Sequence, residues 1–120
     1  MNDRELLEMA AKAAGIHIDK SPYNGGGLGN TGFDMLGSAV LDWHNHKTWN
    51  PLASDGDALR LAVKLRLEIE RSKHSECVVY VGEVGAGQLF ERSDEKTDIF
   101  AATRRAIVRA AAEIGRAIKE

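Results

Sequence analysis

The most informative part of the sequence is WNPLASDGDALRLAVKL, residues Trp49 to Leu65. Its Asn-Pro pair favours a turn, and Ser54 or Asp55 offers a side-chain oxygen that can cap the helix that follows. Asp57 places a negative charge in the first helical turn, where backbone N–H groups have no helical partner. The stretch therefore predicts a turn and then a capped amphipathic helix from about Asp57 to Leu65.

Alternating segments follow this helix. LRLEIERS (Leu65–Ser72) places apolar and charged residues on opposite faces with a period of two, and CVVYVGEV (Cys77–Val84) is a more apolar run of strand-forming residues. A third strand is expected around Gln88–Arg92, after the Gly85–Gly87 turn. Short linkers make hairpins the economical connections, so these segments predict an antiparallel meander.

Helices are also expected towards both ends of the chain. Asp3–Ala14 has apolar residues at three- and four-residue spacing, and Gly15 is placed to stop that helix. The last helix begins near Thr97 or Asp98 and runs to about Lys119. Its predicted core-facing stripe consists of Phe100, Thr103, Ile107, Ala110, Ala111, Ile114 and Ile118.

The region between the first helix and the central stretch has weaker patterns. Ile16–Asp19 alternates as a short strand would, and Ser38–Trp49 alternates weakly, which suggests a strand with an aromatic anchor. Ser21–Gly37 holds six of the 12 glycines and has too few apolar side chains for a core element. Because ordering such a run costs much backbone entropy, we expect a mobile loop there.

Length and composition suit one globular domain. A chain of 120 residues, 43% hydrophobic and 28% charged, can bury a single core. The elements above describe one α+β domain over residues 1–120, with a small antiparallel sheet of about three to five strands packed by two or three helices. The 16 Lys and Arg against 18 Asp and Glu give a net charge of −2, which argues against binding nucleic acid through bulk positive charge.

Cysteine use and hydropathy indicate the compartment. Cys77 is the only cysteine, so no intramolecular disulfide or thiolate metal cluster can form, and a buried, inert thiol is expected. No apolar run reaches the ~20 residues that span a bilayer, and the acidic, amphipathic first residues are unlike a signal peptide. We therefore expect a cytoplasmic protein without a membrane partner.

Short motifs point to chemistry only weakly. GLGNTG (Gly27–Gly32) matches the glycine pattern of dinucleotide-binding loops, but no crossover helix or parallel strand pair is expected around it, which favours a plain loop. His44 and His46 could share one strand face and bind a metal with His17 or Asp42, although a solvated polar edge is the commoner outcome. No set of residues predicts catalysis or a cofactor, so we expect a non-enzymatic protein.

Arginines of the last helix are the strongest electrostatic feature. Arg105, Arg109 and Arg116 fall on one side of a helical wheel, with Arg104 on the flank. Guanidinium groups bind phosphates and carboxylates, so this stripe could contact a nucleic acid, a nucleotide or an acidic protein, whereas a solvated charged face is the bland alternative. One of the two tryptophans could add an exposed anchor, although burial of both is commoner. The candidate contact residues are Arg104, Arg105, Arg109, Arg116, Trp43 and Trp49.

Three segments resemble small phage- and prophage-encoded proteins of the NinX-like type. They are ELLEMAAKAAG in the first helix, WNPLASDGDALRLAVKL in the centre and ATRRAIVRAAAEIG in the last helix. Tyr23–Gly37 and His44–His46 have no place in that pattern. The resemblance implies an accessory phage protein made in the bacterial cytoplasm, with no established catalytic role and no active-site residues to transfer.

These observations favour a non-enzymatic accessory protein that binds an unidentified host or phage macromolecule, with a protein favoured over a nucleic acid. The alternative is a small-molecule binding protein that holds a nucleotide or signalling metabolite between the backbone near Gly25–Gly32 and Arg104 or Arg105. Alanines of the last helix extend beyond the stripe that one sheet would cover. We therefore expect that face to pack against another helix or a symmetry mate, and we expect a homodimer.

Overall fold

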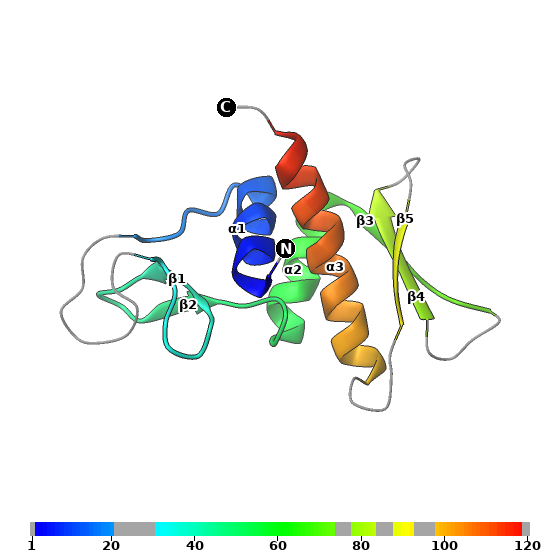
Figure 1. Cartoon of the computed structure of the whole chain (residues 1–120), viewed down its shortest axis with the longest axis horizontal. Coiled ribbons are helices and arrows are strands. Elements are labelled where there is room, and N and C mark those ends of the chain that lie inside the picture. The colour runs from blue at the N-terminus through cyan, green and yellow to red at the C-terminus, as the bar shows by residue number, and fades with distance from the viewer. Residues whose placement is uncertain (1, 21–30, 74–77, 84–87, 93–97, 119–120) are drawn as a thin grey trace.

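Helix α3 (Ile99–Ala117) lies in the middle of the fold (Figure 1). A three-stranded sheet lies on one side of it and α1 (Asp3–Ala14) on the other, with a two-stranded hairpin on the far side of α1. The computed structural model describes residues 2–20, 31–73, 78–83, 88–92 and 98–118, with backbone alone for 88–92. The α+β class is confirmed, although the described strands form two antiparallel sheets rather than one.

Each described helix begins at a side chain that caps it. Asn2 caps α1, Ser54 caps α2 (Asp55–Leu65) and Asp98 caps α3, and in each case the side-chain oxygen accepts a hydrogen bond from the N–H three residues later. Gly15 ends α1 in the left-handed conformation (φ 70°) that its missing β-carbon allows. The first two predicted helices are confirmed, and α2 starts two residues earlier than expected because Ser54 is the cap.

The segment predicted as one strand before the central stretch is a hairpin. Strands β1 (Ala39–Asp42) and β2 (Lys47–Trp49) pair antiparallel. The Asp42 carboxylate accepts hydrogen bonds from the backbone N–H groups of His44 (3.0 Å) and Asn45 (3.3 Å), which fixes the reversal. The single-strand prediction is therefore wrong because these polar residues turn the chain.

The predicted meander is confirmed. Strands β3 (Leu67–Arg71), β4 (Val78–Glu83) and β5 (Gln88–Arg92) form an antiparallel sheet with β4 in the centre. Val79 and Val81 of β4 are buried and belong to the main hydrophobic core. The helix-facing side of the sheet is therefore the side on which these two valines lie.

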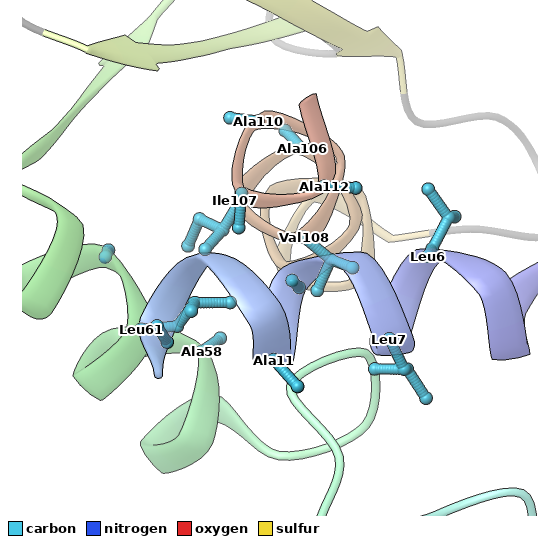
Figure 2. Close-up of a cluster of buried hydrophobic side chains, with 14 of the residues drawn as sticks. Leu6, Leu7, Ala11, Ala58, Leu61, Ala106, Ile107, Val108, Ala110 and Ala112 are labelled. Atoms are coloured by element: carbon cyan, nitrogen blue, oxygen red, sulfur yellow. The ribbon is translucent and has the colours of Figure 1, made fainter. Parts of the chain in front are cut away.

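Small residues let α3 pack on two sides. Ala110 lies on the side of α3 towards the sheet and Val108 points towards α1 (Figure 2). Helices α1 and α3 run in the same direction, because Arg105 near the start of α3 binds Asp3 and Ile118 just after its end accepts a hydrogen bond from Lys12. The alanine face that was expected to meet another helix therefore meets α1 of the same chain.

The predicted stripe of α3 is wrong in part. Ile107, Ala110 and Ala111 are buried as expected, but Phe100 and Ile118 are exposed. Burial follows the positions where α1 and the sheet approach the helix, and these carry small residues rather than the largest apolar ones. The buried residues of α3 are Ala102, Ala106, Ile107, Val108, Ala110, Ala111, Ala112 and Gly115.

Two expectations for the region before β1 also need correction. Ile16–Asp19 belongs to no strand, although the Asp19 N–H donates a hydrogen bond to the carbonyl of Val40 (2.8 Å). Phe33 is buried, forms a bridge with Ala39 and has the Arg4 guanidinium 5.2 Å from its ring. Part of the predicted loop therefore joins the core, while residues 21–30 lie outside the described residues and their mobility stays a prediction.

Candidate functional site

Four large apolar side chains are exposed around one part of the surface. Leu59 and Val63 of α2 are 60% and 69% exposed, Ile69 of β3 is 44% exposed and Phe100 of α3 is 67% exposed. Leu59, Ile69 and Phe100 line the same cleft, which has a volume of about 350 Å³. Val63 lies one helical turn after Leu59 on the same face of α2. We call this surface the apolar cleft.

The apolar cleft lies between α2, β3 and α3. Aliphatic and aromatic groups form most of its walls, and the polar side chains come from one acid, one hydroxyl and two arginines. Ligand and partner sites in proteins commonly combine an apolar surface with a few polar groups in this way. The lining residues are Asp55, Ala58, Leu59, Ile69, Arg71, Ile99, Phe100, Thr103, Arg104 and Ile107.

The composition of α2 explains why Leu59 and Val63 are exposed. Apolar residues occupy most of the circumference of this helix, and its buried positions are Ala58, Leu61 and Ala62. Leu59 and Val63 project from a neighbouring face, so the rest of the described fold leaves them uncovered. A helix that is apolar on more than one face needs a second surface to cover it.

Strand register places Ile69 on the same side as the helices. Ile69 is directly opposite Val81 of β4, and residues that face each other across an antiparallel pair project from the same face. Because Val81 is buried, Ile69 faces the helices too, but it lies on the edge strand and stays partly exposed. It therefore forms the sheet wall of the apolar cleft.

Arg104 of α3 lines the apolar cleft and binds the start of α2. Its Nη1 lies 2.7 Å from Oδ1 of Asp55, and its Nε donates a hydrogen bond to the carbonyl of Leu52 (3.0 Å). The Arg104 side chain is only 20% exposed, whereas that of Asp55 is 76% exposed. These contacts fix the start of α2 against α3, so this guanidinium is engaged in joining two walls of the cleft.

The other predicted contact arginines also have partners within the chain. Arg105 pairs with Asp3 of α1 (3.0 Å), and Arg116 pairs with Glu113 one helical turn away (3.2 Å). Arg109 is half-buried and also interacts within the chain. The structure thus places the four arginines of α3 in separate local contacts rather than on one free basic face.

The two tryptophans lie in the interior. Trp43 is buried and its indole N–H donates a hydrogen bond to the carbonyl of Asp19 (2.9 Å). Trp49 is buried in the main hydrophobic core. Neither offers an exposed ring to a partner, which is the outcome that the sequence analysis judged commoner.

The histidine pair lies in the β1–β2 turn and not on a strand. His44 and His46 are exposed, and His46 has a positive φ of 53°. Asn45 donates a side-chain hydrogen bond to Asp42 (2.6 Å), and this bond is the main cause that lowers the pKa of Asp42 below its ordinary value of 3.8. Asp42 therefore holds the turn, and the described residues contain no group of three or more His, Cys, Asp or Glu suited to a metal ion.

The remaining sequence motifs fall partly outside the described residues. Cys77 and residues 27–30 of the glycine motif lie there. Gly32 is described: it has a φ of 83°, and its carbonyl accepts a hydrogen bond from Val40 (2.8 Å). Residues 33–38 form no helix, so this motif lacks the following helix that a dinucleotide site requires.

Comparison of the chain with protein-family models, with curated proteins and with solved structures gives no match. The resemblance to NinX-like phage proteins accordingly stays a prediction. Of the helices in the described part of the chain, none combines the length and the apolar character needed to cross a bilayer.

Of the residues that line the apolar cleft, Arg104 was a predicted contact residue, but sequence reasoning missed the exposed apolar ones. Phe100 was assigned to the core, and Leu59 and Val63 were counted only as part of an amphipathic helix. The available signal was the breadth of the apolar surface of α2, since Leu59 and Val63 lie off the face formed by Leu61 and Ala62. Ile69 carried no comparable signal, because alternation alone does not show that a strand is at the edge of its sheet.

Proposed function

We propose that this protein is a non-enzymatic binding protein whose apolar cleft contacts a protein partner. The observation that carries the proposal is the gathering of exposed Leu59, Ile69 and Phe100 from three elements around one cleft. Val63 extends this apolar surface one helical turn beyond Leu59. Contiguous exposed apolar surface is uncommon on isolated domains and marks interaction sites. The accessory role in the cytoplasm of a phage host belongs to this proposal.

Phe100 is the expected anchor of the contact. Aromatic side chains contribute large contact areas, and a few such residues usually supply most of the binding energy of an interface. Covering a large apolar side chain is worth roughly 1.5–3 kcal/mol. The ion pair between Arg104 and Asp55 at the edge of the apolar cleft adds polar groups that can set the orientation of a partner.

The proposal favours a protein over a nucleic acid or nucleotide because of the charges. Arg104, Arg105 and Arg116 are paired with Asp55, Asp3 and Glu113. A phosphate would have to replace these carboxylates. The nucleotide-binding alternative stays a prediction, and its glycine-rich component lies largely outside the described residues.

Selection of peptides on the protein tests the proposal. Binders are enriched from a displayed library of random dodecapeptides, and their affinities are then measured by fluorescence anisotropy against Leu59→Ser and Phe100→Ser. We expect at least tenfold weaker binding to Phe100→Ser, because truncation of an interface anchor typically removes about 2 kcal/mol or more. A smaller loss is expected for Leu59→Ser.

Matched controls come from the other exposed apolar residues. Met35 and Leu36 are exposed in the turn before β1 and do not line the apolar cleft. Met35→Ser and Leu36→Ser should leave peptide affinity unchanged, and thermal melts should show that all four variants fold. Selected peptides that bind the cleft variants and wild type equally would contradict the proposal.

A further inference from the structure

Resting on the proposed function, we propose that the partner presents an extended segment that pairs with the outer edge of β3. Its apolar side chains lie on the same side as the apolar cleft, and its Lys or Arg side chains lie opposite Glu68 and Glu70 on the other face. The occupant is thus a strand of alternating apolar and basic residues.

The first observation is that β3 is an edge strand. The sheet order is β3-β4-β5, and within the described part of the chain no other strand pairs with the outer edge of β3. An edge strand directs the N–H and C=O groups of alternate residues away from its sheet. Those groups can bind the backbone of an added strand, which is a common way to recognise extended peptides.

The second observation is that the two faces of β3 have different chemistry. Ile69 and Arg71 project to the helix side, opposite the buried Val81 and Val79, and both line the apolar cleft. Glu68 and Glu70 project to the other face and are exposed. An added strand would therefore meet apolar surface on one side and carboxylates on the other.

The third observation is that the two carboxylates, those of Glu68 and Glu70, have no ion-pair partner among the side chains that the structure describes. Opposite charges at facing positions stabilise a strand pair, and like charges destabilise it. Lys or Arg at two positions separated by one residue would satisfy both carboxylates of β3.

The same charges argue against a second copy as the occupant. If β3 paired antiparallel with β3 of another copy around a two-fold axis at Ile69, Glu68 of each copy would lie opposite Glu70 of the other. That arrangement creates two repulsive contacts. A heterologous basic strand is therefore the occupant that fits this edge.

Synthetic peptides test this inference. The probe is a heptapeptide that alternates Ile and Lys, and the matched controls are the Ile and Glu analogue and a permuted peptide of the same composition as the probe. We expect the probe to bind wild type more tightly than both controls. Two favourable cross-strand pairs give an expected preference of roughly twofold to thirtyfold. In Glu68→Lys/Glu70→Lys the preference should reverse towards the Ile and Glu analogue.

Backbone readouts separate strand addition from simple charge attraction. N-methylation of the peptide amides that face β3 should abolish binding, whereas methylation of the alternate amides should not, and hydrogen exchange of the outward N–H groups of β3 should slow. Equal binding of both methylated series, or unchanged exchange in β3, would overturn the inference.

The two proposals fail in different ways. If library-selected peptides lose affinity in Phe100→Ser but leave β3 exchange unchanged, the apolar cleft stands as a binding site and the strand inference is wrong. If the probe slows hydrogen exchange in β3 but binds Phe100→Ser and Leu59→Ser as tightly as wild type, the apolar cleft takes no part in binding. That result would contradict the proposed function and would remove the link between the β3 edge and the cleft.

Discussion

Gly115 shows how one residue sets the distance between two helices. A β-carbon at this position would overlap the carbonyl oxygen of Met9 and lie 2.8 Å from its carbonyl carbon. The absence of a side chain therefore lets α3 and α1 approach closely, and the alanines on both helices complete the contact. Nothing in the local sequence marks this glycine, because its reason lies in a helix that is far away in the chain.

Gly115→Ala should destabilise the fold although alanine is the better helix former. The helix propensity gain of up to about 1 kcal/mol is opposed by a backbone clash, and overpacking of this kind typically costs about 1–3 kcal/mol. Gly56→Ala is the control, since its β-carbon would meet only the flexible end of Arg60. Urea denaturation should show a lower unfolding free energy for Gly115→Ala and an equal or higher one for Gly56→Ala.

Asp42 gives a prediction about pH. Because hydrogen bonds, first of all from the Asn45 side chain, lower the pKa of Asp42, the folded state favours the carboxylate. Its stabilising contribution is complete above the unfolded pKa and is lost as pH falls through the lowered folded pKa. In Asn45→Ala the pKa of Asp42 should rise towards 3.8. An NMR titration of the Asp42 carboxyl carbon checks this, and an unaltered midpoint would show that the side-chain bond is unimportant.

Predictability at the residue scale depends on sequence separation. Ser54 could be predicted as a cap because the N–H that it binds lies only three residues away. The pairing of Arg104 with Asp55 was not accessible, because 49 residues separate the two and only the packing of α2 on α3 joins them. A helical wheel shows the arginines as one basic stripe because it does not include acidic partners from distant segments, such as Asp55 and Asp3.

Elements with their own periodicity were predicted well. Helices α1 and α2 and the β3–β5 meander follow from amphipathic spacing, caps and alternation. The sequence predicts one strand in place of the β1–β2 hairpin because the turn contains a tryptophan and histidines rather than the usual Asn-Gly or Asp-Gly pair. The alternation in Ile16–Asp19 predicts a strand, but these residues form no ladder of hydrogen bonds with a described strand.

The edge of β3 gives a prediction at the scale of the element. Glu68→Lys would turn both Glu–Glu contacts of a two-fold β3 pair into Lys–Glu contacts, so this variant should self-associate more strongly than wild type. Glu68→Lys/Glu70→Lys restores like charges and should not. Sedimentation velocity over a concentration series measures the difference, and stronger association of the double variant would show that edge charges do not control pairing.

At the scale of the whole molecule, the fold class could be predicted but the candidate site could not. The apolar cleft exists because α2, β3 and α3 meet and leave Leu59, Ile69 and Phe100 uncovered. Which apolar face stays exposed is decided by tertiary packing rather than by periodicity. The homodimer stays a prediction, although the alanine face that suggested it is covered by α1 within the chain.

Hydrogen exchange of the whole protein with and without a library-selected peptide shows directly which surface binds the peptide. We expect slower exchange confined to the three elements that border the apolar cleft, namely residues 59–63, 67–71 and 99–104, with no change in the β1–β2 hairpin. Exchange that slows in the hairpin while these three segments remain unchanged would contradict the assignment of the apolar cleft as the binding surface.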